Sequence, residues 1–173
     1  MTQRRGFAAG LAGAACLAVL GRVSPARAVL PRGKAEKIIV MKAERVLYLV
    51  RGGEVMRSYQ VALGRQPRGT KLYQGDGRTP EGTYEISAFN AQSRFHRSLR
   101  VSYPNEHDRA VARALGQSTG GDIMVHGLAP ERRNFKNEHW RFNWTNGCIA
   151  VDDDEIEEIW QRVAIGTPIE IRP

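Results

Sequence analysis

The stretch NWTNGCIAVDDDEIEEIW, residues 143–160, decides how this sequence folds. It joins three local signals: the turn dipeptide Asn146-Gly147, a short apolar strand at 148–151, and an amphipathic helix. It also holds Cys148, one of two cysteines in the chain; the other, Cys16, lies in a predicted export signal. A single thiol in a secreted chain indicates intermolecular pairing or a reactive group. The alternative is a small buried apolar side chain.

Residues 152–166 predict the best helix of the chain. Asp152 can cap its N-terminus, with Glu155 completing a capping box. Acidic residues crowd the first turn, where the helix dipole favours them, so the acidic run needs no metal to explain it. Gly166 is predicted to close the helix. One face is apolar: Ile156, Ile159, Trp160 and Val163.

The rest of the chain predicts short strands with turns between them. Strands are expected at 37–42, 45–50, 55–64, 83–89, 121–127 and 167–173, from their aliphatic and β-branched content. Gly52-Gly53 marks a tight hairpin turn, and the Gly- and Pro-rich residues 65–82 predict a loop. The middle, 88–121, is polar and poorly periodic, with a short helix expected at 112–116. We therefore expect a mainly β domain with one C-terminal helix and a short middle helix.

The N-terminus has the pattern of a secretory signal peptide at residues 1–28. Arg4 and Arg5 precede an apolar run that ends before the small-x-small cleavage site 26–28. The run is short of the about 20 apolar residues that a membrane-spanning helix needs. The sequence RRGF also resembles a twin-arginine signal, so either export route fits. We expect an exported protein, in the periplasm or cell wall, with a short segment at 29–36 and one domain at 37–172.

Charge narrows the class of partner. Removing residues 1–28 leaves 22 of the 26 basic residues against all 18 acidic ones, a net charge of +4. No basic cluster with interleaved aromatic residues is present in the sequence, so nucleic acid is not an expected partner. A modest positive charge on an exported protein suits an anionic partner such as the cell wall. No stable membrane span is expected after signal cleavage.

A thiol needs a base to act as a nucleophile at neutral pH, because the thiolate is the reactive form. Four histidines are available. His96 and His107 lie among charged residues, which is typical of the surface, and His139 could be a surface residue or line a cleft. His126 ends an apolar strand where Gly127 lets the chain turn, a position suited to a catalytic group and equally to a hydrogen-bonded core histidine.

These motifs together resemble the L,D-transpeptidase (YkuD-like) family. The resemblance rests on IMVHG, residues 123–127, followed by WTNGCIAV, residues 144–151, and an acidic helix. YQVALG, GRTPEGTYEI and IGTPIEI match the family's strand and loop signatures in the same order, so the resemblance covers 37–172.

The resemblance implies a β-sandwich of mixed sheets that acts on the stem peptides of peptidoglycan. By position, Cys148 is the implied nucleophile and His126 the proton acceptor and donor, with the Gly127 carbonyl orienting the imidazole. The amides of Gly147 and Cys148 are implied to hold the oxyanion. Attack on a donor peptide gives a thioester, which an amine acceptor converts to a cross-link. No cofactor and no metal is implied.

The sequence departs from the family pattern beside the nucleophile. Many members have Ser-His-Gly-Cys where this chain has Thr145-Asn146-Gly147-Cys148, and 21 residues separate His126 from Cys148, a longer gap than usual. The motif resembles a subgroup with WT-x-GC, some of whose members release wall-bound protein by hydrolysis. The acceptor can therefore be an amine or water, and a wall-attached protein is a second candidate partner.

Other residues near the motif have weaker predicted roles. Trp144, Thr145 and Asn146 could contact substrate, and Trp140 could wall the cleft with Trp144. Four arginines could hold substrate carboxylates at its entrance: Arg65, Arg68, Arg78 and Arg94. The competing hypotheses are a wall-binding module without catalysis, a thiol-redox protein, which lacks a CxxC partner, and a metal site, for which the histidines lack close spacing.

Overall fold

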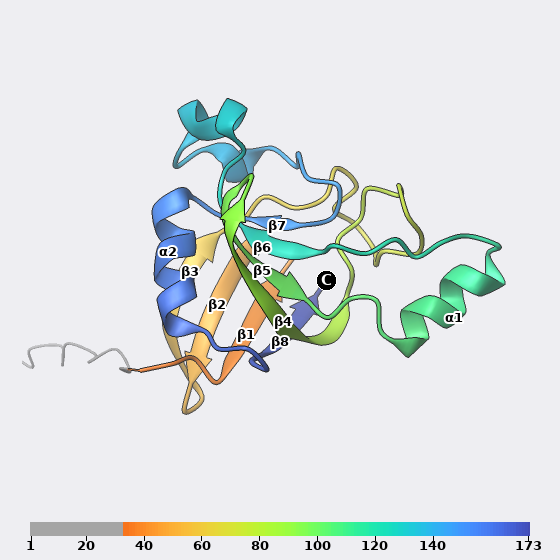
Figure 1. Cartoon of the computed structure of the whole chain (residues 1–173), viewed down its shortest axis with the longest axis horizontal. Coiled ribbons are helices and arrows are strands. Elements are labelled where there is room, and N and C mark those ends of the chain that lie inside the picture. The colour runs from red at the N-terminus through yellow and green to blue at the C-terminus, as the bar shows by residue number, and fades with distance from the viewer. Residues whose placement is uncertain (1–32) are drawn as a thin grey trace, which may run out of the picture.

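The computed structural model describes residues 33–173 (Figure 1). The predicted export signal at 1–28, Cys16 and the first part of the 29–36 segment lie outside the described residues. The α-helices are Glu106–Ala114 (α1) and Asp153–Arg162 (α2), and the 3₁₀-helices are Pro130–Phe135 (η1) and His139–Arg141 (η2). The strands are Lys37–Met41 (β1), Val46–Arg51 (β2), Glu54–Gln60 (β3), Gly82–Ser93 (β4), His96–Val101 (β5), Met124–His126 (β6), Ile149–Ala150 (β7) and Pro168–Arg172 (β8).

The eight strands of the described residues form one mixed sheet, in the order β3-β2-β1-β8-β4-β5-β6-β7. β4 joins its two halves, because Gly82–Glu85 pairs with β8 and the rest of the strand pairs with β5. β1–β8 and β6–β7 are parallel and the other pairs antiparallel. Ala62, after β3, exchanges both backbone hydrogen bonds with Ala150 in β7, so the sheet curls around its core. The predicted mainly β, mixed-sheet fold is confirmed.

One apolar core joins the two halves of the sheet and α2. Ile38 and Leu49 come from the first half, Leu99 and Val125 from the second, and Ile156 from the helix, and all five are fully buried. The apolar face of α2 thus packs as its spacing predicts. Within residues 33–173, no helix is long and apolar enough to cross a membrane.

Two local predictions hold at the level of single residues. Gly52 and Gly53 form the β2–β3 turn with φ of 57° and 80°, which side chains disfavour. Asp152 is the N-cap residue of α2, and its amide donates to Glu155 Oε2 at 2.9 Å, which is the Glu155 half of the predicted capping box.

The C-terminus of α2 was wrongly predicted. The helix ends at Arg162, and Val163 is already extended with its side chain in the core. Gly166 instead belongs to a tight turn in which Thr167 N–H donates to the Ala164 carbonyl, leading into β8. Burial of Val163 and the pairing of β8 override the local signal for a longer helix.

The middle of the chain also differs from the prediction. Residues 88–101 are not irregular: β4 continues to Ser93 and pairs with β5 as a hairpin. Its register shifts twice and its outer half is mostly exposed, which removes the alternation that predicts a strand. α1 begins at Glu106, before the expected 112–116, because Asn105 caps it. The Asp108 amide donates to Asn105 Oδ1 at 3.0 Å, and the Asp108 carboxylate accepts from the Asn105 amide at 2.9 Å. Figure 1 shows α1 far from the α2 side of the sheet.

Candidate active site

His126 and Cys148 lie at neighbouring strands of the sheet. His126 is the last residue of β6, and Cys148 directly precedes β7, its parallel neighbour. Both residues line one cavity of about 540 Å³. The chain between them, with η1 and η2, lies above the ends of these strands (Figure 1). Pairing of two short strands therefore brings together two residues that are remote in the sequence.

The His126 ring is fixed in orientation and in tautomer. Nδ1 lies 2.6 Å from the Gly127 carbonyl oxygen, which can only accept, so Nδ1 carries the proton and Nε2 has the lone pair. The side chain is buried, and burial lowers the pKa of His126 to about 4, against the opposing effect of the Gly127 hydrogen bond. The imidazole is therefore neutral at physiological pH and able to accept a proton.

Two aromatic side chains enclose this imidazole. Phe95 stacks on it with ring centroids 4.4 Å apart and an interplanar angle of 29°. Trp144 meets it edge-on at 5.7 Å. Trp144 was predicted to contact substrate and wall the cleft, whereas Phe95 was not predicted. The only available signal was an aromatic residue in the charged segment SRFHRS, residues 93–98, where a surface position is the default.

Cys148 is half-buried, so the sulfur is not sealed inside the core. Its thiol donates to the Asp122 carbonyl, with 3.4 Å between Sγ and the oxygen. Burial raises the pKa of the Cys148 thiol, while a hydrogen bond from the Met124 amide lowers it. The resting side chain is therefore a neutral thiol, turned toward Asp122.

The turn before Cys148 is held by the Thr145 hydroxyl. Thr145 Oγ1 donates to the Cys148 carbonyl at 2.7 Å and accepts from the Gly147 amide at 3.1 Å. Gly147 has φ of +131°, and a Cβ there would lie 2.6 Å from the Arg78 carbonyl oxygen. The turn thus requires glycine for both conformation and space. The Gly147 amide, one of the two implied oxyanion donors, is already engaged by Thr145.

Comparison with known proteins identifies the family of this chain. A family model described as the L,D-transpeptidase catalytic domain, YkuD, matches residues 35–171. The chain belongs to the L,D-transpeptidase family. This is an enzyme family that acts on peptidoglycan.

Proteins with similar sequences carry names from the same family. The chain is 27% identical over 163 residues to a protein of Escherichia coli named "Putative L,D-transpeptidase YafK", covering 86% of this chain and 58% of that protein. It is 25% identical over 133 residues to "Putative L,D-transpeptidase YqjB" of Bacillus subtilis, covering 76% of this chain and 68% of that one. The chain thus spans little more than half the length of the first relative.

Solved structures share the L,D-transpeptidase fold. The helical cell shape determining protein Pgp2 of Campylobacter jejuni aligns with a TM-score of 0.55 and 21% identity, over 78% of this chain and 46% of that one. An L,D-transpeptidase of Mycobacterium smegmatis aligns with a TM-score of 0.52 and 17% identity, over 79% of this chain and 58% of that one.

Three arginines and two acidic residues, Asp122 and Glu131, line the cavity that holds His126 and Cys148. Arg65, Arg94 and Arg132 line it, and the Arg132 guanidinium lies 5.0 Å from the centroid of the Trp144 ring. Of the predicted entrance arginines, Arg68 lines a different pocket, and Arg78 is absent from the residues that line this one. The sequence did not single out Arg132, because its neighbours in the chain are also charged.

A second cavity of about 660 Å³ adjoins the first. The two share Arg65, Gly121, Asp122 and Asn146 in their walls. Asp122 and Asn146 therefore form a partition between the two cavities, and Cys148 lines the first of them. Asn146 is exposed and faces both spaces, whereas Thr145 is buried and acts on the turn.

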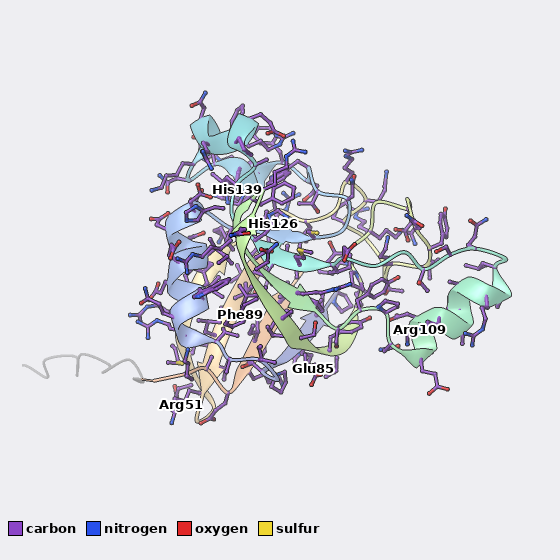
Figure 2. All side chains as sticks on the ribbon, viewed as in Figure 1. Arg51, Glu85, Phe89, Arg109, His126 and His139 are labelled. Carbon is purple, nitrogen blue, oxygen red and sulfur yellow. The ribbon has the colours of Figure 1, made fainter. Side chains whose placement is uncertain are left out.

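The N-terminus of α2 supports the segment that follows His126. Asp153 Oδ1 accepts from the Leu128 amide at 2.8 Å, and the Val151 amide donates to the His126 carbonyl at 2.9 Å. Asp153, in the acidic first turn of α2, thus holds the backbone of Leu128, two residues after His126. Figure 2 shows His126 and His139 at the same end of the sheet.

Proposed function

We propose that this protein is a cysteine-dependent acyltransferase acting on peptidoglycan stem peptides, an L,D-transpeptidase by activity as well as by family. One observation carries the proposal. His126 and Cys148 line one open cavity, and the hydrogen bond from Nδ1 to the Gly127 carbonyl leaves the lone pair of His126 on Nε2. A positioned base beside an accessible thiol is the requirement for nucleophilic catalysis by cysteine.

In the first half-reaction, Cys148 leaves the Asp122 carbonyl and gives its proton to Nε2 of His126. The sulfur attacks the carbonyl carbon of an L,D-linked donor peptide and forms an oxyanion. The Cys148 amide is the better candidate to stabilise this oxyanion, because the Gly147 amide donates to Thr145. Collapse breaks the peptide C–N bond, the leaving amine takes the proton from His126, and a thioester remains on Cys148.

The protonation states favour general-base catalysis over a preformed ion pair. Burial raises the pKa of Cys148 and lowers that of His126 to about 4, so the neutral thiol and neutral imidazole are the resting forms. Proton transfer then accompanies the attack. Substrate that displaces water from the cavity keeps both groups in this state.

In the second half-reaction an acceptor resolves the thioester. An amine from a second stem peptide gives its proton to Nε2 of His126, forms the new amide bond and expels Cys148. The two adjoining cavities suit a donor peptide on one side of the Asp122–Asn146 partition and an acceptor on the other. The arginines Arg65, Arg94 and Arg132 suit peptide carboxylates.

Hydrolysis is the second candidate function, and the WTNGC motif favours it through its resemblance to the WT-x-GC subgroup. Water then replaces the amine, and the product is a shortened peptide or a protein freed from the wall. The acyl-enzyme and its residues are unchanged. The two functions differ only in the acceptor.

Purified peptidoglycan fragments carrying tetrapeptides test both functions. The unchanged protein is expected to form a thioester on Cys148, seen as a mass increase of the intact chain, and to release the terminal residue. Cys148→Ala and His126→Ala are expected to abolish turnover while the circular dichroism spectrum is retained. Turnover by folded Cys148→Ala at the parent rate refutes the proposal. Cross-linked dimers in the mass spectrum identify transfer, and shortened monomers identify hydrolysis.

We also propose that the protein acts outside the cytoplasm, on the strength of the signal pattern at residues 1–28. A reporter enzyme active only after export, fused behind the whole chain, is expected to be active. Arg4→Lys with Arg5→Lys separates the two routes, because the twin-arginine route depends on that pair.

A further inference from the structure

A second group of chemically active side chains lies outside the catalytic cavity. His139 comes from η2, and Asp152 and Glu155 come from the first turn of α2. One ligand atom from each of these three side chains lies within 4.8 Å of the other two. They line a separate pocket of about 150 Å³, beside Trp140. The mechanism proposed for Cys148 uses none of the three.

The His139 imidazole is buried without a polar partner. The side chain is 1% exposed, and within residues 33–173 neither ring nitrogen has a hydrogen-bond partner. Asp152 Oδ1 is also buried without a partner among these residues. The 3.7 Å between His139 Nε2 and Asp152 Oδ1 is too long for a hydrogen bond. Buried polar atoms are nearly always paired, so these two atoms point to a ligand.

Other bonds hold the two carboxylates in place. Asp152 Oδ2 accepts from the Asn137 amide at 2.9 Å, and Glu155 Oε2 accepts from the Asp152 amide at 2.9 Å. One oxygen of each carboxylate is therefore committed to the backbone. The second oxygen of each carboxylate is available to a ligand, and these backbone hydrogen bonds fix its orientation.

The donor set specifies the class of ligand. One neutral imidazole and two carboxylates suit a divalent transition-metal ion, whereas Ca²⁺ and Mg²⁺ prefer oxygen ligands alone. Zn²⁺ bonds of about 2.1 Å in a tetrahedron put ligand atoms about 3.4 Å apart. The 3.7 Å between His139 Nε2 and Asp152 Oδ1 is close to that spacing. The two carboxylates also supply negative charge that offsets a divalent cation.

We propose that His139, Asp152 and Glu155 form a binding site for one divalent transition-metal ion, with Zn²⁺ as its representative. The ion joins η2 to α2 and so fixes the chain that leads from η2 to Trp144 and Cys148. Its role is structural, because the site lies outside the cavity that holds the thiol. A fourth position is left for water or for the Gln60 side chain, which lines the same pocket.

The test measures Zn²⁺ binding by the whole chain without a histidine tag. All proteins carry Cys148→Ser, because a thiol beside His126 can itself bind Zn²⁺. After treatment with a chelator, Zn²⁺ is titrated by calorimetry and by competition with a chromophoric chelator. The parent is expected to bind one ion per chain, and its melting temperature is expected to rise in Zn²⁺.

Three variants locate the ion. His139→Ala is expected to lose at least tenfold in affinity and the thermal shift with it. Glu155→Gln is the second variant, since glutamine still accepts from the Asp152 amide and keeps the helix cap while losing the anionic ligand. His107→Ala is the matched control, because His107 is an exposed histidine on α1 and should leave binding unchanged.

Cobalt supplies an independent readout. Co²⁺ in place of Zn²⁺ is expected to give the visible absorption of a nitrogen and oxygen site, lost in Glu155→Gln. A parent that binds no Zn²⁺, or affinity unchanged in folded Glu155→Gln, overturns the proposal. Equal losses in His139→Ala and His107→Ala also overturn it.

Discussion

The reactivity of Cys148 should follow pH in a way that distinguishes a resting thiol from a thiolate–imidazolium pair. Burial holds the pKa of Cys148 above its ordinary value of 9.0 and lowers the pKa of His126 to about 4. Between these values both groups are neutral in the substrate-free protein. We expect alkylation by iodoacetamide to report the small thiolate fraction alone.

The magnitude follows from these pKa values. A thiol with a pKa above 9.0 is less than about 1% ionised at pH 7, and the ionised fraction grows tenfold per pH unit. The alkylation rate of Cys148 should therefore rise about tenfold per unit from pH 5 to pH 8. His126 adds no step in that range, because it loses its proton near pH 4.

The assay follows the peptide that contains Cys148 by mass spectrometry at a series of pH values, so that Cys16 does not contribute. His126→Asn should show the same unit slope, since a neutral imidazole contributes no charge to the thiolate. A plateau or an inflection between pH 5 and pH 7 that disappears in His126→Asn would refute the reasoning. It would show that an ion pair exists before substrate binds.

Three further changes should have defined effects. Thr145→Val keeps the shape of the side chain but removes its two hydrogen bonds, at about 1 kcal/mol each. We therefore expect kcat to fall at least tenfold. Thr145→Ser keeps the hydroxyl and should restore activity. Phe95→Leu uncovers His126, and the pKa of that imidazole, followed by NMR, should rise toward its ordinary value of 6.5 as water enters. Asp76→Asn breaks the ion pair with Lys71, in which both side chains are 4% exposed, and should lower the free energy of unfolding by about 3 kcal/mol at pH 7. Burial raises the pKa of Asp76, but the hydrogen bonds to Lys71 and to backbone amides outweigh burial and lower this pKa below its ordinary value of 3.8. The stabilisation by Asp76 is therefore present above pH 3.8 and is lost as the pH falls through the lower pKa of the folded state. Denaturant curves in which Asp76→Asn matches the unchanged protein at pH 7 would contradict this.

Local signals in the sequence were sufficient for much of the fold. The Gly52-Gly53 turn, the Asp152–Glu155 cap and the apolar face of α2 each depend on residues a few positions apart. The sequence also singled out His126 and Cys148, because each follows or precedes a short apolar strand beside a glycine. Such local features form in any tertiary structure that buries the same faces of these elements.

The β4–β5 hairpin was missed because its partners are distant. Phe89 packs on Trp160 of α2, with ring centroids 4.6 Å apart, and His96 and Arg97 both contact Glu157 at 2.8 Å. These contacts stabilise a ribbon whose own sequence is polar and whose register is interrupted. Phe95 reaches His126 because it directly precedes β5, which pairs antiparallel with β6 and places Ser98 opposite His126.

The sequence by itself determined which residues can do chemistry and which short elements hold them. Tertiary structure decided what those residues touch. Parallel pairing of β6 with β7 sets Cys148 beside the His126 cavity, and the depth of burial moves their two pKa values apart. The same packing brings His139 against the first turn of α2, a group that no spacing in the chain predicts. The physical reason is that desolvation and ligand geometry depend on neighbours in space, and for these residues the neighbours are far away in the chain.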